Sequence, residues 1–409
     1  MDTAASTLPQ DGPARPEPAP QPTAQPDPRP AGRRVGRIAV LDGLRLLAAL
    51  MVVAHHYLAL GGTAWDGEPT SQLFPQLHIL AAYGRFGVEL FFLISGFVIC
   101  MSTWGKSLSD FFTSRVIRLF PAYWFAVLAT TAVVALVPGG LRAHHWRDVL
   151  VNLTMLHRPI RVDDVDGVYW TLWAEMRFYL IFALVVWRGV TYRKVVAFCC
   201  LWSVGSILMA YSSLGPVRGL LLPGECWFFI AGLAFYLIHR FGPDLLLWSI
   251  VVFSYLMGQH EAMAMHRDLE HALGYAFPAY GTTALITAFF LIMAAVSLGW
   301  FKRINWRWLP TAGALTYPLY LLHEYIGWEL IRSLRGHAPP LALAGIAAAA
   351  MLVAAWLVNR LLERPLSKVL RRSLKHSFER IRALDPGSGR PLPRLPEPRQ
   401  PDPVGPGPS

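Results

Sequence analysis

A series of long apolar blocks, separated by short polar connections, restricts this chain to very few folds. Each block is about 20 residues long, the length that an α-helix needs to cross the roughly 30 Å hydrocarbon core of a bilayer. The ten blocks lie near residues 38–60, 79–102, 121–138, 169–188, 193–211, 219–240, 243–259, 275–298, 311–333 and 341–361. The sequence therefore predicts an all-α, polytopic membrane protein with about ten transmembrane helices.

Composition agrees with lipid as the solvent of this chain. Hydrophobic residues make up 54% of the sequence and charged residues only 15%, which is unusual for a soluble protein of this length. The net charge is +11, but lysine and arginine fall in short clusters between apolar blocks rather than on one basic face. We therefore expect contacts with membrane lipids and no nucleic-acid partner.

Proline-rich segments flank the apolar region at both ends. Residues 1–32 and 385–409 hold nine prolines each and lack a helical apolar period, so neither can bury enough surface to fold. We predict disordered tails at 1–36 and 385–409, a transmembrane domain at 37–366 and a basic juxtamembrane segment at 367–384. The first tail has no apolar core of a signal peptide, so we expect no cleavage.

The distribution of positive residues predicts the orientation. With the N-terminus in the cytoplasm, nineteen lysines and arginines fall on inside connections and eight on outside ones. The positive-inside rule then places both termini in the cytoplasm and the protein in the inner or plasma membrane. The long connection 139–168 carries four arginines matched by four aspartates. Its short apolar run, 149–156, is expected to be an interfacial or re-entrant piece.

The four cysteines predict neither a metal site nor a disulfide framework, because they sit inside apolar blocks without the required spacing. They are Cys100, Cys199, Cys200 and Cys226. We expect them to pack as small hydrophobic residues.

A charged residue inside an apolar block requires an explanation, because burying arginine in hydrocarbon costs at least about 2.5 kcal/mol. In the first block Arg45 and His56 are eleven residues apart, so on a helix they share one face about 16 Å apart. Asp42, Ala48 and Val52 lie on that face too. This column predicts one wall of a narrow path for an extended ligand.

His56 is a candidate general base, because the pKa of a free imidazole lies near neutrality. The alternative is that its ring only bonds a neighbouring helix, as polar groups often do in membrane bundles. The adjacent His55 points about 100° away on the same helix.

The second block places Glu89 and Ser95 at helical spacing on one side. A carboxylate within the membrane is a functional candidate, and the alternative is a structural ion pair with Arg85 or Arg45. Ser95 lacks the partners of a serine nucleophile. Together with Gly96 it is expected to let helices approach closely.

Arg115 and Arg118 lie one helical turn apart before Pro121, which is expected to begin the next helix. Two guanidinium groups on one face suit a phosphate or pyrophosphate, such as those of coenzyme A. The alternative is that the pair only sets membrane orientation or binds lipid head groups.

Three further blocks carry polar residues in unusual places. Glu175 lies among aromatic residues near an interface, Tyr317 and His323 belong to the stretch YPLYLLHEY, and Glu363 precedes Pro365. For each, a structural hydrogen bond or ion pair is the alternative to a functional role.

Taken in order, these blocks resemble the membrane-bound acyltransferase-3 family from about Ala39 to Pro365. The similarity is carried by six motifs: Arg45 and His56 separated by ten residues, GVELFFLISGF, Arg115 and Arg118 before PAYW, WTLWAEMRFY, YPLYLLH, and the final ERP. The resemblance implies a ten-helix core. It also implies that His56 is the catalytic histidine, that Arg45 assists it, and that Arg115 and Arg118 engage the acyl donor.

We add further residues to this expected site. Glu175 is expected to act with His56 and Arg45 in catalysis, and Asp42 to lie in the donor site. Supporting positions are Glu89, Ser95, Tyr317, His323 and Glu363. No metal is expected.

The resemblance implies an O-acyltransferase that moves a short acyl group from acyl-CoA, with acetyl-CoA favoured, and that has no permanently bound cofactor. The acceptor would be a hydroxyl of a carbohydrate, of a macrolide or other glycoside, or of a lipid-linked sugar. The protein itself is expected to be a standalone membrane core without an extracytoplasmic domain. Direct base-assisted attack and an acyl-His56 intermediate both remain open. The competing hypothesis is a secondary transporter or acyl exporter whose charged residues line a path. The sequence does not determine the acceptor or the oligomeric state.

Overall fold

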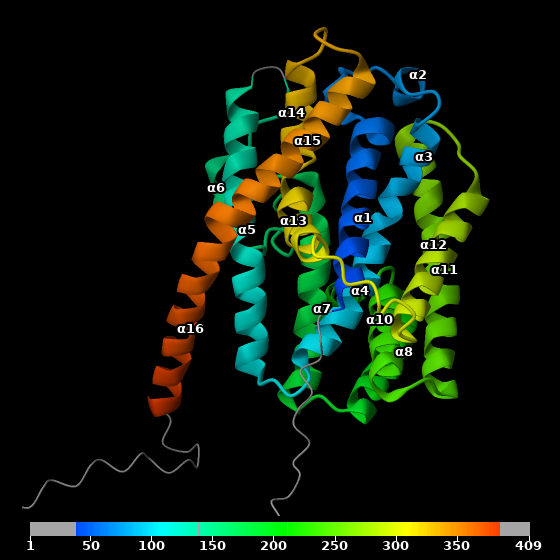
Figure 1. Ribbon diagram of the computed structural model, residues 1–409, viewed down its shortest axis with the longest axis vertical. Helices are drawn as coiled ribbons and strands as arrows, with labels where there is room; N and C mark the ends of the chain where they lie inside the picture. The colour runs from blue at the N-terminus through cyan, green and yellow to red at the C-terminus, as the bar shows by residue number, and fades with distance from the viewer. Residues whose placement is uncertain (1–37, 138–139, 211, 385–409) are drawn as a thin grey trace, which may run out of the picture. The chain divides into compact units, whose positions relative to one another are not determined.

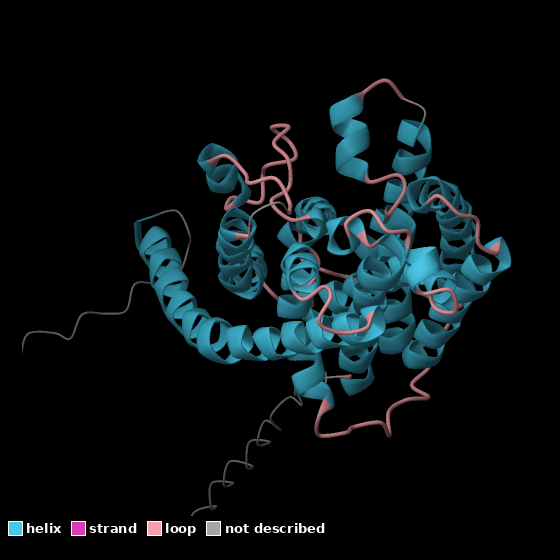
Figure 2. Ribbon diagram, turned by 90° about the horizontal axis from the view of Figure 1, so that it is seen from above, coloured by secondary structure: helices cyan, strands magenta, loops and turns pink. Residues whose placement is uncertain are grey.

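The computed structural model describes residues 38–137, 140–210 and 212–384, and the regular elements in these ranges are all helices. Most helices run alongside one another as a bundle (Figure 1). Figure 2, seen from above, shows helices joined by loops. The predicted all-α class is confirmed. The predicted tails, 1–36 and 385–409, lie outside the described residues.

The α-helices of the bundle have the following bounds: α1 Ala39–His55, α2 Thr70–Leu73, α3 His78–Ala82, α4 Gly87–Thr103, α5 Leu108–Leu136, α6 Trp146–Asn152, α7 Trp170–Trp187, α8 Tyr192–Ala210, α9 Gly215–Leu221, α10 Cys226–Phe241, α11 Leu245–Leu273, α12 Ala279–Ser297, α13 Leu309–Leu322, α14 Tyr325–Ser333, α15 Pro340–Val358 and α16 Arg364–Leu384. Shorter 3₁₀ turns are Gly62–Trp65, Tyr83–Phe86 and Gly167–Tyr169, and two π-helical turns are His56–Leu60 and Asn359–Glu363.

Eight helical stretches within the described residues are long and apolar enough to span a membrane, so the chain is a multi-pass membrane protein. They are Ala39–Leu60, His78–Thr103, Leu108–Leu136, Gly167–Trp187, Tyr192–Ala210, Gly215–Phe241, Ala279–Ser297 and Pro340–Leu374. The other two predicted spans, 243–259 and 311–333, are also helical. The first lies in α11, whose second half is polar, and the second is divided between α13 and α14.

Helices α4 and α10 form the centre of the bundle. Every residue from Cys226 to Ile238 in α10 is buried. Gly96 of α4 and Gly232 of α10 meet at the crossing. A Cβ atom on Gly96 would lie 2.2 Å from the carbonyl oxygen of Phe229, and one on Gly232 would lie 2.2 Å from that of Leu93. Only glycine permits this approach, so Gly96 packs as the sequence predicted.

The predicted boundary at Pro121 is wrong. Helix α5 begins thirteen residues earlier, at Leu108, and contains Pro121 in its interior. The Ser107 hydroxyl accepts a hydrogen bond from the backbone N–H of Asp110 (3.2 Å) and caps the helix start. Arg115 and Arg118 therefore lie within a long helix and not in a connection.

Three helices are interrupted at positions that the sequence marked for chemistry. Helix α1 passes into a π-helical turn at His56, and α15 passes into one that ends at Glu363. Helix α13 ends at Leu322, and α14 starts at Tyr325. Such interruptions are frequent at functional sites because they redirect side chains and backbone groups. The segment 367–384, predicted to be basic and juxtamembrane, belongs to helix α16.

Candidate active site

The first half of the site is a pair of histidines contributed by the interrupted ends of α1 and α13. The Nδ1 atom of His56 lies 3.0 Å from the carbonyl oxygen of Val52 and 3.0 Å from Nε2 of His323. The Nδ1 atom of His323 lies 2.9 Å from the carbonyl oxygen of Tyr320. Both rings are buried. His323, expected as a supporting residue, therefore contacts the expected catalytic histidine directly.

These contacts determine where the protons lie when both rings are neutral. A carbonyl oxygen only accepts, so His323 Nδ1 donates to Tyr320 and His323 Nε2 carries the lone pair. That lone pair accepts from His56 Nδ1, which must therefore be protonated. The free lone pair of His56 is then on Nε2. A general base needs this arrangement, with one nitrogen anchored and the other available.

Two aromatic side chains hold the backbone of the histidine pair. Trp328 Nε1 donates to the carbonyl oxygen of His56 (3.0 Å), and the Tyr57 hydroxyl donates to that of His323 (2.7 Å). The π-helical turn leaves the His56 carbonyl to accept a bond from Gly61 N–H as well (3.0 Å). These bonds fix the spacing between the end of α1 and the break before α14.

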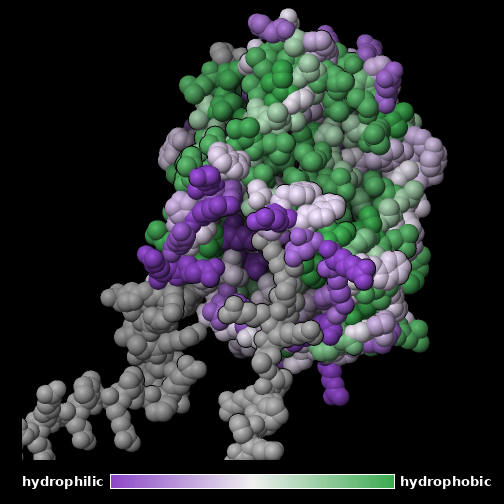
Figure 3. Space-filling view, viewed as in Figure 1, coloured by the Kyte–Doolittle hydropathy of each residue, from purple (hydrophilic) through white to green (hydrophobic). Residues whose placement is uncertain are grey.

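The second half of the site is a cavity between α1, α4, α5, α7 and α13. It is lined by Arg45, Val88, Phe91, Phe92, Ser95, Arg118, Leu119, Thr171, Leu172, Glu175, Gly313, Thr316, Tyr317 and Tyr320. In the space-filling view, hydrophilic residues gather around a hollow in the lower part of an otherwise largely hydrophobic face (Figure 3). The lining combines an apolar wall with a few charged groups, as is usual for ligand sites.

The charged groups of the cavity come from three helices: Arg45 from α1, Arg118 from α5 and Glu175 from α7. The charges of Arg118 and Glu175 both act on Arg45. Glu175 Oε1 accepts hydrogen bonds from the hydroxyls of Ser95 (2.9 Å) and Tyr179. The carboxylate is thus held in place, and the two arginines give the cavity a positive balance that suits an anionic ligand.

Arg115 and Arg118 lie on the same helix but have different surroundings. Arg118 lines the cavity, whereas Arg115 is buried behind it. Arg115 Nη2 donates to the Ser102 hydroxyl (3.0 Å), and its guanidinium lies 5.7 Å from the ring centre of Tyr179. Arg115 therefore supports the residue that bonds Glu175.

Tyr320 connects the two halves of the site. Its side chain lines the cavity, its ring centre lies 5.6 Å from that of His323, and its carbonyl accepts from the same histidine. Its hydroxyl is 3.0 Å from that of Thr171. Tyr320 thus contacts both the cavity and the histidine pair.

Comparison with known proteins assigns the chain. The model of the acyltransferase-3 family, described as an acyltransferase domain, matches residues 38–360. The chain belongs to this family. The match covers the whole of the cavity and both histidines, so the site described above lies inside the acyltransferase domain.

Curated relatives of this acyltransferase-family chain include three named proteins. Nodulation protein 10 of Rhizobium leguminosarum bv. viciae is 29% identical over 42% of this chain and 48% of its own length. Acyltransferase MdmB of Streptomyces mycarofaciens is 29% identical over 51% of this chain and 59% of its own. The O-acetyl transferase of Shigella phage Sf6 is 24% identical over 63% and 77%. The chain thus spans about half the length of the first two. No solved structure matches.

The remaining expected residues of the acyltransferase site lie around it. Tyr317 lines the cavity and donates to the carbonyl of Leu119 (3.0 Å). Asp42 packs so closely on Gly313 that a Cβ there would lie 2.2 Å from Asp42 Oδ1. Glu363 accepts from Asn359 Nδ2 (2.5 Å) at the second π-helical turn.

Glu89 does not line the cavity. Its carboxylate lies 3.6 Å from Arg85, whose guanidinium lies 5.0 Å from the ring centre of Trp170. This is the structural ion pair that was the alternative interpretation of Glu89 in the sequence.

Sequence reasoning missed two carboxyl groups beside the histidine pair. Glu324 Oε1 lies 3.7 Å from His56 Nε2, and Asp166 lies next to Glu324. The position of Glu324 next to His323 in the sequence could have indicated its role. Nothing in the sequence distinguished Asp166, which was counted only as one of the four aspartates that balance the arginines of its loop.

Proposed function

We propose that this protein is an O-acyltransferase that moves a short acyl group, acetyl in the first instance, from acyl-CoA to a hydroxyl group of a carbohydrate, a macrolide or other glycoside, or a lipid-linked sugar. One observation carries the proposal. The cavity that holds Arg45 and Arg118 is lined by Tyr320, whose ring lies beside His323, and His323 in turn bonds His56 and leaves its Nε2 free. The arginines suit the phosphates of the donor, and the histidine suits the reacting end.

The chemistry follows from this arrangement. In direct transfer, His56 Nε2 takes the proton of the acceptor hydroxyl as its oxygen bonds to the thioester carbon. The carbon–sulfur bond then breaks, and the proton passes to the coenzyme A thiolate. In the alternative route, Nε2 itself attacks the thioester carbon, the carbon–sulfur bond breaks, and coenzyme A leaves as its thiolate. The acceptor hydroxyl then attacks the acyl-imidazolium, which frees Nε2, and its proton passes to the thiolate.

The acetyl group is supported by the name of the phage relative, an O-acetyl transferase. Sugar acceptors are supported by the family resemblance. We infer that both termini are cytoplasmic, so that Arg45, in the second turn of α1, would lie on the side of cytoplasmic acyl-CoA.

The test is acceptor-dependent cleavage of the thioester. Purified protein in nanodiscs is given radiolabelled acetyl-CoA with a panel of glycosides, macrolides and lipid-linked sugars. The expected result is release of coenzyme A thiol together with a labelled ester, for at least one acceptor. A transporter or exporter would move a substrate across vesicles without releasing thiol. Thiol release that no acceptor stimulates would contradict the proposal.

A further inference from the structure

Asp166 and Glu324 form a buried carboxyl pair beside the histidines. Asp166 is fully buried and Glu324 is 5% exposed. The segments that carry them are packed together: a Cβ atom on Gly167 would lie 2.7 Å from Glu324 Oε2, and the backbone N–H of Tyr325 donates to Asp166 Oδ2 (3.2 Å). Glu324 Oε1 faces Nε2 of His56 at 3.7 Å, the nitrogen whose lone pair is free. Two ionised carboxylates buried so close together would repel one another, so the pair must hold at least one proton.

The surrounding bonds indicate which carboxyl holds the charge. Asp166 accepts from the backbone N–H groups of Val168 (3.2 Å) and Tyr325 (3.2 Å), which favour its ionised form. Glu324 Oε2 has no hydrogen-bond partner among the described residues. When the pair holds one proton, Glu324 therefore carries it and Asp166 keeps the negative charge.

Among the described residues, His56 is the nearest group that can supply a positive charge to the pair. In the part of the chain that the structure describes, neither carboxyl forms an ion pair with a lysine or an arginine. An uncompensated buried charge is costly. Burial raises the pKa of Asp166 to about 7, even though its hydrogen bonds act in the opposite direction. The natural counter-charge is the imidazolium that forms when His56 accepts a proton.

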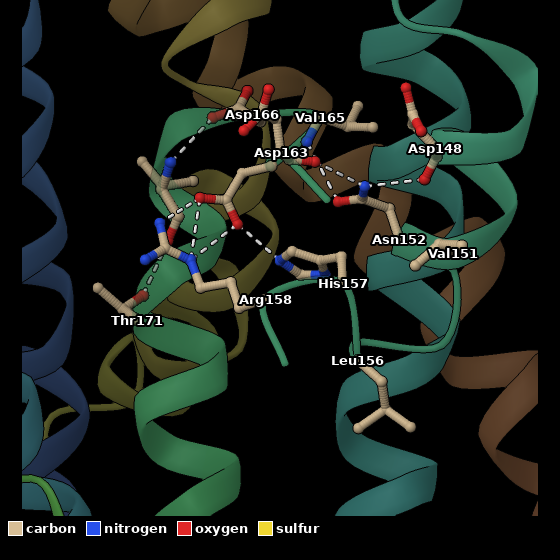
Figure 4. A network of polar contacts seen from close by, with 12 residues as sticks. Asp148, Val151, Asn152, Leu156, His157, Arg158, Asp163, Val165, Asp166 and Thr171 are labelled. Atoms are coloured by element: carbon tan, nitrogen blue, oxygen red, sulfur yellow. Dashed lines mark hydrogen bonds and ion pairs between the residues drawn. The ribbon is translucent and has the colours of Figure 1, made fainter. Parts of the chain in front are cut away.

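The loop that carries Asp166 is built to hold it in place (Figure 4). Asn152, at the end of α6, donates to the carbonyls of Asp148 (2.9 Å) and Asp163 (2.9 Å) and accepts from Val165 N–H (3.1 Å). His157 bonds Asp164 at 2.6 Å. These hydrogen bonds hold the loop that leads to Asp166 in one conformation, which positions the buried acid.

We propose that Asp166 and Glu324 form a proton-sharing pair that stabilises the protonated state of His56 during acyl transfer. Glu324 is the positioning residue next to the imidazole, and Asp166 supplies the negative charge. The inference rests on the proposed function, because it requires His56 to accept a proton. It adds an acidic partner that lies outside the cavity and comes from a different loop.

The experiment tests whether the carboxyl group of Glu324 or the size of its side chain matters for acyl transfer. Glu324→Gln keeps the shape of the side chain and removes its carboxyl group, whereas Glu324→Asp shortens it and keeps the carboxyl. We expect Glu324→Gln and Asp166→Asn each to lower kcat about 10²-fold with little change in KM for acetyl-CoA or acceptor. Glu324→Asp should retain more activity than Glu324→Gln. A purely structural role predicts the reverse order, since glutamine fits the space better.

Two further variants sharpen the result. The double variant, Asp166→Asn with Glu324→Gln, should have a kcat no lower than that of the less active single variant, because the two residues act as a unit. Asp163→Asn makes the same charge change on an exposed side chain three residues from Asp166 and should behave as the unmodified protein. Thermal stability of every variant is measured in parallel.

The outcomes separate the inference from the proposed function. If the unmodified protein transfers acetyl, His56→Ala does not, and Glu324→Gln is as active as the unmodified protein, only the role of the pair is overturned. That role is also overturned if Glu324→Asp is less active than Glu324→Gln, or if the single effects multiply in the double variant. If the unmodified protein transfers nothing to any acceptor, the proposed function itself fails.

Discussion

At the scale of single residues, His55 and His56 are neighbours in the sequence but differ in their contacts. His56 is bonded through Nδ1 and leaves Nε2 free, whereas His55 Nδ1 has no partner among the described residues. We expect His56→Ala to lower acyl transfer by at least 10²–10⁴-fold, the usual worth of a general base. His55→Ala should cost far less at matched expression and thermal stability. Greater damage from His55→Ala would make the catalytic assignment wrong.

Arg115 and Arg118 were expected to bind the donor as a pair, but only Arg118 lines the cavity. Arg118→Ala removes charge-assisted hydrogen bonds to phosphate, so KM for acetyl-CoA should rise about 10- to 100-fold. Arg115→Ala should leave KM closer to normal and lower the melting temperature, since its guanidinium packs on Tyr179. Steady-state kinetics with varied acetyl-CoA distinguish the two. Equal effects on KM would return both residues to the donor site.

Asp166 should make the stability of the folded protein depend on pH. Burial raises its pKa from 3.8 to about 7, so the folded protein binds this proton more tightly than the unfolded chain. The contribution to stability is complete below about pH 3.8 and is lost as the pH rises through about 7. The melting temperature of purified protein should therefore fall between pH 5 and pH 8, and Asp166→Asn should flatten that slope. Parallel curves for the two proteins would contradict this.

At the scale of elements, the crossing of α4 and α10 depends on glycine. A Cβ on Gly96 would lie 2.2 Å from the Phe229 carbonyl oxygen, so Gly96→Ala must push the helices apart. We expect a loss of about 1–3 kcal/mol of stability, measured as a lower melting temperature. The matched control is Gly345→Ala in α15, where a Cβ would meet nothing within 4 Å. Gly345→Ala should be neutral or stabilising, because alanine favours helices.

The interrupted helices explain how a membrane bundle assembles a polar site. The end of α1 and the break between α13 and α14 leave backbone carbonyls free to accept from Trp328 and Tyr57. Irregular backbone within a bundle is tolerated only where protein or a cavity satisfies it. Both interruptions border the histidine pair, so the same feature that breaks the helices positions the reactive groups.

At the scale of the whole molecule, the orientation remains a prediction. The sequence count is nineteen positive residues inside against eight outside, and it falls to seventeen when Arg115 and Arg118 are assigned to α5. Either count predicts that both termini are cytoplasmic. A reporter fused after Ser409 that is active only in the cytoplasm should give signal, and a periplasm-dependent reporter should give none. The opposite pattern would place the Arg45 end of α1 away from cytoplasmic acyl-CoA and overturn the donor assignment with it.

The fold class, most of the spans and several site residues could be predicted from the order of amino acids alone. Lipid requires long apolar helices, so their lengths are visible as blocks, and an arginine or histidine within a block is rare enough to mark a site. Arg45, His56 and Glu175 were found in this way. The start of α5 was missed because the apolar block begins at Pro121, although the cap at Ser107 signals the earlier start.

How these residues meet depends on the packing of the helices. His56 lies 267 positions from His323, and Ser95 lies 80 positions from Glu175, yet each pair is hydrogen bonded. Helical spacing along one segment says which residues share a face, but not which neighbouring helix that face meets. Asp166 is the clearest case, since a loop aspartate becomes a buried neighbour of Glu324 only when the turn Gly167–Tyr169 packs against the junction of α13 and α14. Contacts between distant segments arise from tertiary packing, which no local pattern encodes.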